Sequence, residues 1–180
     1  ADPALAGAQV NAVVGDGAGG WFVGGLFVVD GQRRQLLRYD ASGRRTPWAL
    51  DVGGAFAEVY ALKRVGATLY LGGNFTSLAG QSRSLAAALD IPGEAVLPWN
   101  PSVTGTGVFA IEAQGAEVFL GGLFSAVAGT PRTDLASVHN ITAALTPWAP
   151  TGSGFVQGLV ATASLVYRSE EHTSELQSRQ

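Results

Sequence analysis

Three arginines recur at one place in a repeating pattern, and they are the residues best suited to hold a ligand. Each stands at the end of a Gly-x-x-Arg segment, at Arg34, Arg83 and Arg132. A ring of guanidinium groups would suit carboxylate or phosphate ligands, because each group presents a planar fork of donors. A repeated bond from each arginine to a turn carbonyl or a carboxylate explains the same recurrence without a ligand. We favour this structural bond and keep the arginines as ligand candidates.

A glycine-rich segment, residues 15–20 with the sequence GDGAGG, matches the dinucleotide fingerprint G-x-G-x-x-G. That fingerprint needs a helix after the loop, because the first amide groups of the helix face the pyrophosphate. The residues that follow, Trp21-Phe22-Val23, are typical of a strand. We therefore predict a hairpin turn at this segment.

The chain has few residues that could support histidine or cysteine chemistry. His139 is the one histidine outside the C-terminal tail defined below, and there is no cysteine. A Ser-His-Asp relay or a histidine metal site would depend on that single residue. The carboxylates do not recur at equivalent places in the repeat. We predict no catalytic residue, no cofactor and no metal site in these repeats.

Composition limits the partners of the chain. Hydrophobic residues make up 47% of the sequence and charged residues 14%, which excludes a disordered chain. The formal net charge is −3 and the basic residues are scattered, so we expect no nucleic-acid partner. No apolar run is long enough to cross a bilayer, so we expect no membrane span in this chain.

The arginines and the hairpin belong to a repeat of about 49 residues. A Gly-Gly pair ends an apolar segment in each cycle, a phenylalanine follows it, and a Pro-Trp pair lies downstream. The markers of the three cycles are Gly24, Gly25, Phe27 and Trp48, then Gly72, Gly73, Phe75 and Trp99, then Gly121, Gly122, Phe124 and Trp148. A period of this length indicates stacked structural units.

Each cycle contains four short apolar segments separated by turn signals, as at 59–63, 68–71, 85–89 and 96–99. This pattern predicts an all-β fold, a partial β-propeller of about three four-stranded antiparallel blades and the start of a fourth. The expected domain covers 1–167, with cycles at about 9–53, 54–102 and 103–152 and a stub at 153–167. The phenylalanines should fill the space beneath the glycines, and the tryptophans should pack between adjacent blades.

The fourth cycle stops where its Gly-Gly pair is due. There the residues 168–178, RSEEHTSELQS, match nothing earlier and resemble the in-frame translation of a common sequencing adapter. We therefore interpret 168–180 as a non-native tail, with a polar helical tail as the alternative. The chain also contains no methionine, so we interpret it as a processed or incomplete part of a longer protein.

The cycle resembles the kelch motif of β-propellers, in which four apolar residues lead into Gly-Gly. With the Gly-x-x-Arg segment and the Pro-Trp pair added, it is more similar to the bacterial surface propeller repeats of the delta-sixty type. Only the first cycle has the tyrosine that kelch repeats place before the turn, at Tyr39, where later cycles have Leu89 and His139. The resemblance implies secretion or attachment to a bacterial cell surface and transfers no catalytic residue.

Three functions remain open. The first is a non-catalytic extracellular or cell-surface module that binds a protein or glycan. The second is part of a propeller enzyme, an oxidase or hydrolase, whose active site lies in other blades. The third is a passive spacer. Open blade edges also predict self-association, so we expect residues 1–167 alone to aggregate or oligomerise.

Overall fold

The computed structural model of the protein describes residues 2, 5–150, 154–170 and 174–178. All of its named elements are β-strands, and every pair among them is antiparallel. The expectation of an all-β fold is therefore confirmed. No helix among the described residues has the length and hydrophobicity needed to cross a membrane.

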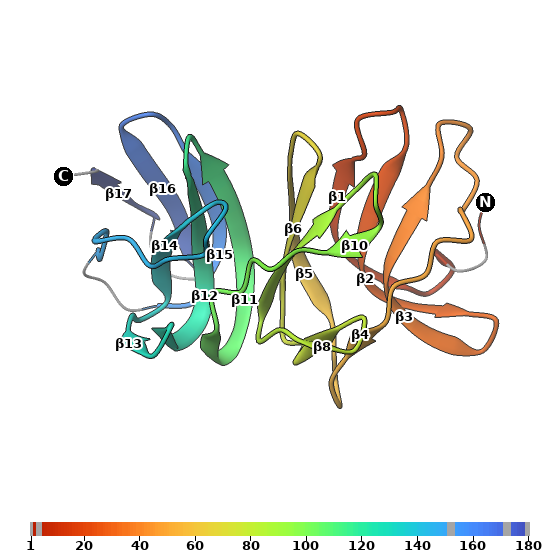
Figure 1. Ribbon diagram of the computed structural model, residues 1–180, viewed down its shortest axis with the longest axis horizontal. Coiled ribbons are helices and arrows are strands. Elements are labelled where there is room, and N and C mark those ends of the chain that lie inside the picture. The colour runs from red at the N-terminus through yellow and green to blue at the C-terminus, as the bar shows by residue number, and fades with distance from the viewer. Residues whose placement is uncertain (1, 3–4, 151–153, 171–173, 179–180) are drawn as a thin grey trace.

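Four larger sheets follow one another along the chain (Figure 1). The first comprises β1 (Gln9–Gly15), β2 (Trp21–Val29) and β3 (Gln32–Tyr39). The second comprises β5 (Val59–Val65), β6 (Thr68–Gly73), β9 (Ala86–Asp90) and β10 (Ala95–Val96). The third comprises β11 (Val103–Gln114), β12 (Glu117–Val127), β13 (Thr130–Pro131) and β14 (Leu135–His139). The fourth comprises β15 (Val156–Ala161), β16 (Leu165–Glu170) and β17 (Ser174–Ser178).

The sheets are arranged as in a propeller. The opening strands of successive sheets are neighbours, so that β1 contacts β5, β5 contacts β11, and β11 contacts β15. The later strands of each sheet extend outward, and the broad faces of neighbouring sheets pack together (Figure 1). One buried apolar cluster, which includes Phe22 and Leu69, joins the first sheet to the second. Another, which includes Tyr70 and Val118, joins the second to the third.

The outermost strand of each cycle is shorter than the sequence predicts. In the second sheet β10 is two residues long, and in the first and third the segment contributes single bridges, Tyr39↔Arg45 and Val138↔Leu145. Each of these segments runs into the proline of the Pro-Trp pair. Proline has no amide hydrogen to donate to a neighbouring strand, so pairing ends there.

Each of the first three cycles also contains a second hairpin, beyond the Gly-Gly corner, that the four-segment prediction lacks. In the first and third sheets it joins β2 to β3 and β12 to β13. In the second cycle it joins β7 (Ser77–Leu78) to β8 (Gln81–Ser82), and β7 also pairs with β4 (Val52–Gly53). The turns are Asp30-Gly31, Ala79-Gly80 and Ala128-Gly129, and both residues of every turn have positive φ. This is the backbone of a two-residue type I′ turn, which glycine adopts at low cost.

The first glycine of each pair lies against the opening strand of the following sheet. A Cβ built on Gly24 would be 2.7 Å from Val59 Cγ1, and a Cβ on Gly121 would be 2.6 Å from Val156 Cγ1. A Cβ on Gly72 would meet Val108 Cγ1 at 2.8 Å. The three corners thus share one environment, in which a larger residue would hold neighbouring sheets apart.

The second glycine lies against its own opening strand. A Cβ on Gly25 would collide with the carbonyl oxygen of Gln9, and one on Gly73 with that of Glu58. The following phenylalanines are all buried, with exposed fractions of 1% for Phe27, 0% for Phe75 and 3% for Phe124.

The recurring tryptophans pack on an aromatic ring two residues before the first glycine. Each pair is edge-to-face, with ring centroids 5.5 Å apart for Phe22–Trp48, 5.1 Å for Tyr70–Trp99 and 5.1 Å for Phe119–Trp148. Trp99 belongs to the second cycle, and its Nε1 donates a hydrogen bond of 2.9 Å to the carbonyl of His139 in the third sheet. This tryptophan therefore bridges two adjacent sheets.

Part of the predicted non-native tail pairs with the last repeat strand. β16 includes residues 168–170, and β17 pairs with it from Leu165↔Ser178 to Ser169↔Ser174. Ser169 lies opposite Gly158, as Gly121 lies opposite Ala110 in the third sheet. Ser169 therefore occupies the place of the first corner glycine.

Candidate functional site

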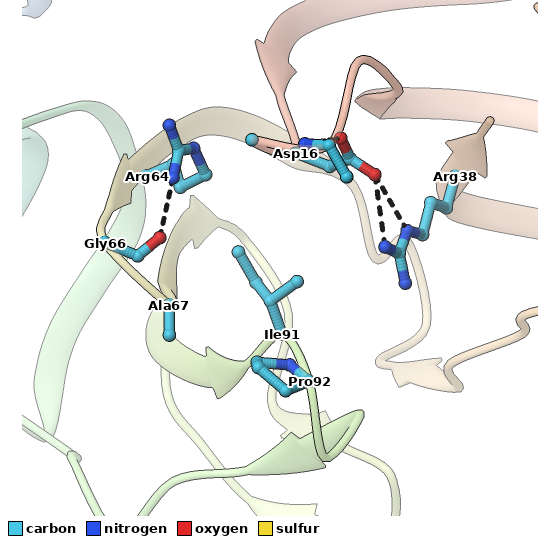
Figure 2. A pocket seen from close by; sticks show the side chains of 9 residues that line it. Asp16, Arg38, Arg64, Gly66, Ala67, Ile91 and Pro92 are labelled. Carbon is cyan, nitrogen blue, oxygen red and sulfur yellow. Dashed lines mark hydrogen bonds and ion pairs between the residues drawn. The ribbon is translucent and has the colours of Figure 1, made fainter. Parts of the chain in front are cut away.

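An open pocket of about 490 Å³ lies where the first and second sheets meet, at the end opposite the Gly-Gly corners. The loop between β1 and β2 and the end of β3 form one side, and the turns after β5 and β9 form the other (Figure 2). Its lining consists of Asp16, Gly17, Ala18, Arg38, Arg64, Gly66, Ala67, Ile91 and Pro92. Two of these residues are arginines, and they come from different sheets.

Asp16 organises the first-sheet side of the pocket. Its Oδ1 accepts hydrogen bonds of 2.8 Å from the amides of both Ala18 and Gly20, and its Oδ2 lies 3.1 Å from Arg38 Nη2. Burial alone would raise the pKa of Asp16, but the bonds from Ala18, Arg38 and Gly20 and the charge of Arg38 outweigh it. The pKa of Asp16 therefore lies below its ordinary value of 3.8, and the carboxylate is ionised at neutral pH.

The glycine-rich segment is the hairpin turn that the sequence predicts. β1 and β2 pair up to Gly15↔Trp21, and the Asp16 amide donates a 2.9 Å bond to the Gly20 carbonyl. The Asp16 carboxylate accepts the hydrogen bonds of the Ala18 and Gly20 amides. In a phosphate-binding loop such amides would face the ligand. The segment therefore does not have the geometry of a dinucleotide site.

The two arginines of the pocket have different surroundings. Arg38 is paired with Asp16 and with Glu94, whose Oε1 lies 3.3 Å from Arg38 Nη1, and its guanidinium stands 5.3 Å from the centre of the Phe22 ring. Arg64 Nη1 donates a 2.7 Å bond to the carbonyl of Gly66. Among the described residues no carboxylate is within ion-pair distance of Arg64.

Gly17 allows Arg64 to lie close to the loop. Its φ is +87°, and a Cβ at this position would be 2.9 Å from Arg64 Nη1. The pocket can thus present the Arg64 guanidinium to a ligand beside the balanced Asp16–Arg38 pair (Figure 2). Such a site suits an anionic group, above all a carboxylate, which a guanidinium can bind through two parallel hydrogen bonds.

The three recurring arginines lie elsewhere, in the hairpins beyond the Gly-Gly corners. Arg83 donates 2.8 Å bonds to the carbonyls of Ser82 and Leu97, and Arg132 donates a 2.9 Å bond to Pro131 and a 3.5 Å bond to Thr146. Arg34 donates a 3.3 Å bond to the carbonyl of Arg33. The bonds of Arg83 to Leu97 and of Arg132 to Thr146 join the hairpin to the outermost segment of its cycle, whereas the bond of Arg34 stays within its own strand.

His139 ends β14, where its Nδ1 accepts bonds from the amides of Ile141 at 3.2 Å and Thr142 at 3.3 Å. It thereby stabilises the following turn. Among the residues that the structure describes, no three histidine, cysteine or carboxylate side chains form a group that could hold a metal ion.

A second surface that sequence reasoning missed follows the opening strands. In each of these strands the pairing register shifts at the residue that follows a valine, a β-bulge, and β11 has two further shifts between Thr104 and Gly107. The residues are Asn11, Tyr60, Phe109 and Gln157. The first three are spaced by 49 residues, immediately after the valines at 10, 59 and 108. The constant spacing is present in the sequence, but a search for recurring residue types does not find it because the residues at these positions differ.

The bulged residues connect each sheet to the next. Asn11 Nδ2 donates to Glu58 Oε1 at 2.9 Å and to the carbonyl of Val59 at 3.0 Å. The rings of Tyr60 and Phe109 are stacked with centroids 4.6 Å apart, and Phe109 meets Phe155 edge-to-face at 4.5 Å. Burial and the neighbouring carboxylate of Glu58 raise the pKa of Tyr60.

Comparison with known proteins gives no matching family model and no matching curated protein. Among solved structures, the chain is similar to the computationally designed Ika4 protein, with a TM-score of 0.58, 14% identity and coverage of 94% of this chain and 91% of that chain. It is also similar to the computationally designed Ika8 protein, with a TM-score of 0.64, 14% identity and 94% of this chain covered, although it spans only 46% of the length of Ika8. At these identities the likeness is one of fold.

Proposed function

We propose that this chain is a non-catalytic β-propeller module that binds a carboxylate-bearing protein or glycan outside the cell or at the cell surface. The observation that carries the proposal is the position of Arg64, a cation that lines an open pocket and whose hydrogen-bond partner is a neutral carbonyl. The ligand would complete the charge balance of this residue.

The pocket has the size and polarity of a small-ligand site. Its volume of about 490 Å³ lies within the roughly 300–1,000 Å³ typical of such sites. Ile91 and Pro92 supply an apolar wall opposite the charged residues (Figure 2). A sugar acid or the terminal residue of a peptide could place its carboxylate on Arg64 and its apolar surface on this wall.

The location outside the cell rests on the repeat pattern. The Gly-Gly corner, the Gly-x-x-Arg segment and the Pro-Trp pair are similar to those of kelch-like bacterial surface repeats of the delta-sixty type. This similarity supports a secreted or surface-attached module.

Isothermal titration with glucuronate, and with a short peptide that has a free C-terminal carboxylate, tests the proposal. Glucose and the same peptide with an amidated C-terminus serve as uncharged controls. We expect saturable binding of at least one acidic probe. Arg64→Gln should abolish this binding. Arg33→Gln, which changes an exposed arginine outside the pocket, should leave it intact. Binding should also weaken as salt is added.

The alternatives give different results. Chemical turnover of a probe would favour a propeller enzyme. A lack of saturable binding by every acidic probe, or binding that Arg64→Gln leaves unchanged, would contradict the proposal, and the first of these results would favour a passive spacer.

A further inference from the structure

The interface between consecutive sheets follows one rule, which occurs three times. The first corner glycine of one sheet faces a valine on the opening strand of the next, and a branched or long aliphatic residue three positions later packs beside it. The facing sets are Gly24 with Val59 and Leu62, Gly72 with Val108 and Ile111, and Gly121 with Val156 and Leu159. All three valines are fully buried, with exposed fractions of 0%.

The first sheet has the valine side of this interface, but no sheet among the described residues covers it. Val10 lies opposite Gly25 just before its bulge, as Val59 lies opposite Gly73 and Val108 opposite Gly122. Val10 is nevertheless 48% exposed. Its position is that of an interface residue, and its exposure is that of a surface residue.

Two further residues of the same face have the same mismatch. Val13 is the equivalent of Leu62 and is 55% exposed. Trp21 stands three residues before the corner glycine, where Leu69 and Val118 are fully buried, yet it is 52% exposed. We call Val10, Val13 and Trp21 the open face. Contiguous exposed apolar residues of this kind mark interaction surfaces.

The outer part of the same side is already covered. Asp2 accepts a 2.9 Å bond from the Tyr39 hydroxyl and a 3.1 Å bond from Arg45 Nε, and Ala8 packs on the apolar cluster that contains Val23 and Tyr39. An incoming sheet would therefore contact the inner part, where the open face lies.

The complementary side occurs at the other end of the chain. Tyr167 of β16 lies opposite Val160, as Phe119 lies opposite Glu112 in the third sheet. Tyr167 is therefore the equivalent of Phe119, the aromatic residue two positions before the first corner glycine. Val160 is 58% exposed. Ser169 occupies the glycine position, and its Cβ would reduce the space for the valine of a following sheet.

We propose that the open face docks the β15–β16 hairpin of a second copy of this chain, head to tail, and that Ser169, which belongs to the tail that we interpret as non-native, weakens this contact. The contact would repeat the rule of the three internal interfaces, with Val10 and Val13 of one copy facing position 169 of the other. Because the two contacting surfaces differ, this arrangement is heterologous.

Sedimentation velocity over a wide range of concentration tests the proposal on the full chain. We expect reversible association that Val13→Lys weakens at least about tenfold, because the contact would bury an unpaired charge. Ser169→Gly should strengthen the association, since it restores the residue that the rule requires. Ile141→Lys is the matched control, because Ile141 is 76% exposed in a turn of the third cycle, away from both faces.

Cysteine cross-linking tests the register directly, because the chain has no cysteine of its own. A Cβ on Gly24 would lie 3.3 Å from the Cβ of Val59, close to the roughly 3.5–4.5 Å of a disulfide. An oxidised mixture of Val10→Cys and Ser169→Cys chains should therefore give mainly the mixed dimer. A monomer at all concentrations, association that Val13→Lys leaves intact, or equal cross-linking of Ser169→Cys to Ile141→Cys would overturn the proposal.

Discussion

Trp99 joins the second sheet to the third through one hydrogen bond to His139. Its indole Nε1 donates a hydrogen bond of 2.9 Å to the carbonyl oxygen of His139, while its ring packs edge-to-face on Tyr70 of its own sheet. Trp99 is 2% exposed, so water cannot easily replace the indole as the donor to that carbonyl.

Replacing Trp99 with phenylalanine should lower the free energy of unfolding by about 1 kcal/mol, because the His139 carbonyl loses one of its two donors and keeps the Ala143 amide at 3.0 Å. Trp48→Phe should cost less, since Trp48 is only partly buried. Urea denaturation followed by circular dichroism measures both values without relying on tryptophan fluorescence. Equal losses in the two variants would show that the bond to His139 adds no stability.

Gly24 and Val59 should be energetically coupled. Gly24→Ala should destabilise the protein by about 1–3 kcal/mol, because its Cβ would lie 2.7 Å from Val59 Cγ1. Combining it with Val59→Ala should cost less than the sum of the two single changes, since the smaller side chain makes room. Gly15→Ala is the control, because its Cβ would meet its nearest neighbour at an ordinary 3.9 Å. Additive losses would mean that the cost of the Cβ does not come from its contact with Val59.

The sequence was a good guide to the parts of the fold that recur. Glycine pairs and Pro-Trp pairs at a constant period indicate equivalent corners, because a close approach between sheets excludes a Cβ at the same place in every unit. The hairpins beyond the corners were not predicted. Their turns read Asp30-Gly31, Ala79-Gly80 and Ala128-Gly129, and only the first has the Asp-Gly signal of a type I′ turn.

The pocket was beyond sequence reasoning because its residues do not recur. Arg38 pairs with Phe22 across two strands, and the equivalent partner of Tyr70 in the second sheet is Ala88. Arg64 reaches the same pocket from the other sheet. A repeat search finds what all units share, whereas this site depends on residues found in one unit each.

Asp16 should make stability depend on pH in the acid range. Its pKa is lowered in the folded protein, so its contribution is complete above the unfolded pKa of about 4 and is lost as the pH falls through the folded value. The urea midpoint of the protein should therefore fall at acid pH, and more steeply than that of Asp16→Asn. Arg38→Gln should raise the pKa of Asp16, which NMR titration of the carboxyl carbon would detect. An unchanged value would contradict the role of the Arg38 pair.

The Tyr39 hydroxyl should ionise at a higher pH than an ordinary tyrosine. Burial, the hydrogen bond to Asp2 and the charge of Asp2 raise its pKa to about 12. The contribution of the neutral phenol is complete below the unfolded pKa of about 10 and is lost as the pH rises through the folded value. Ultraviolet titration should show one late-titrating tyrosine that is missing in Tyr39→Phe. A late transition that persists in this variant would assign it to another residue.

The bulge in each opening strand places the residue that varies between units next to the valine that packs against the neighbouring sheet. Val10, Val59, Val108 and Val156 keep one residue type on the packing side, while the neighbouring bulged positions hold an amide, a phenol, a phenyl ring and a second amide. The valine contact between sheets can therefore stay the same while the residue at the bulge differs from unit to unit. An engineer who changes a bulged residue would have to replace the hydrogen bond or ring contact that it makes with the next sheet.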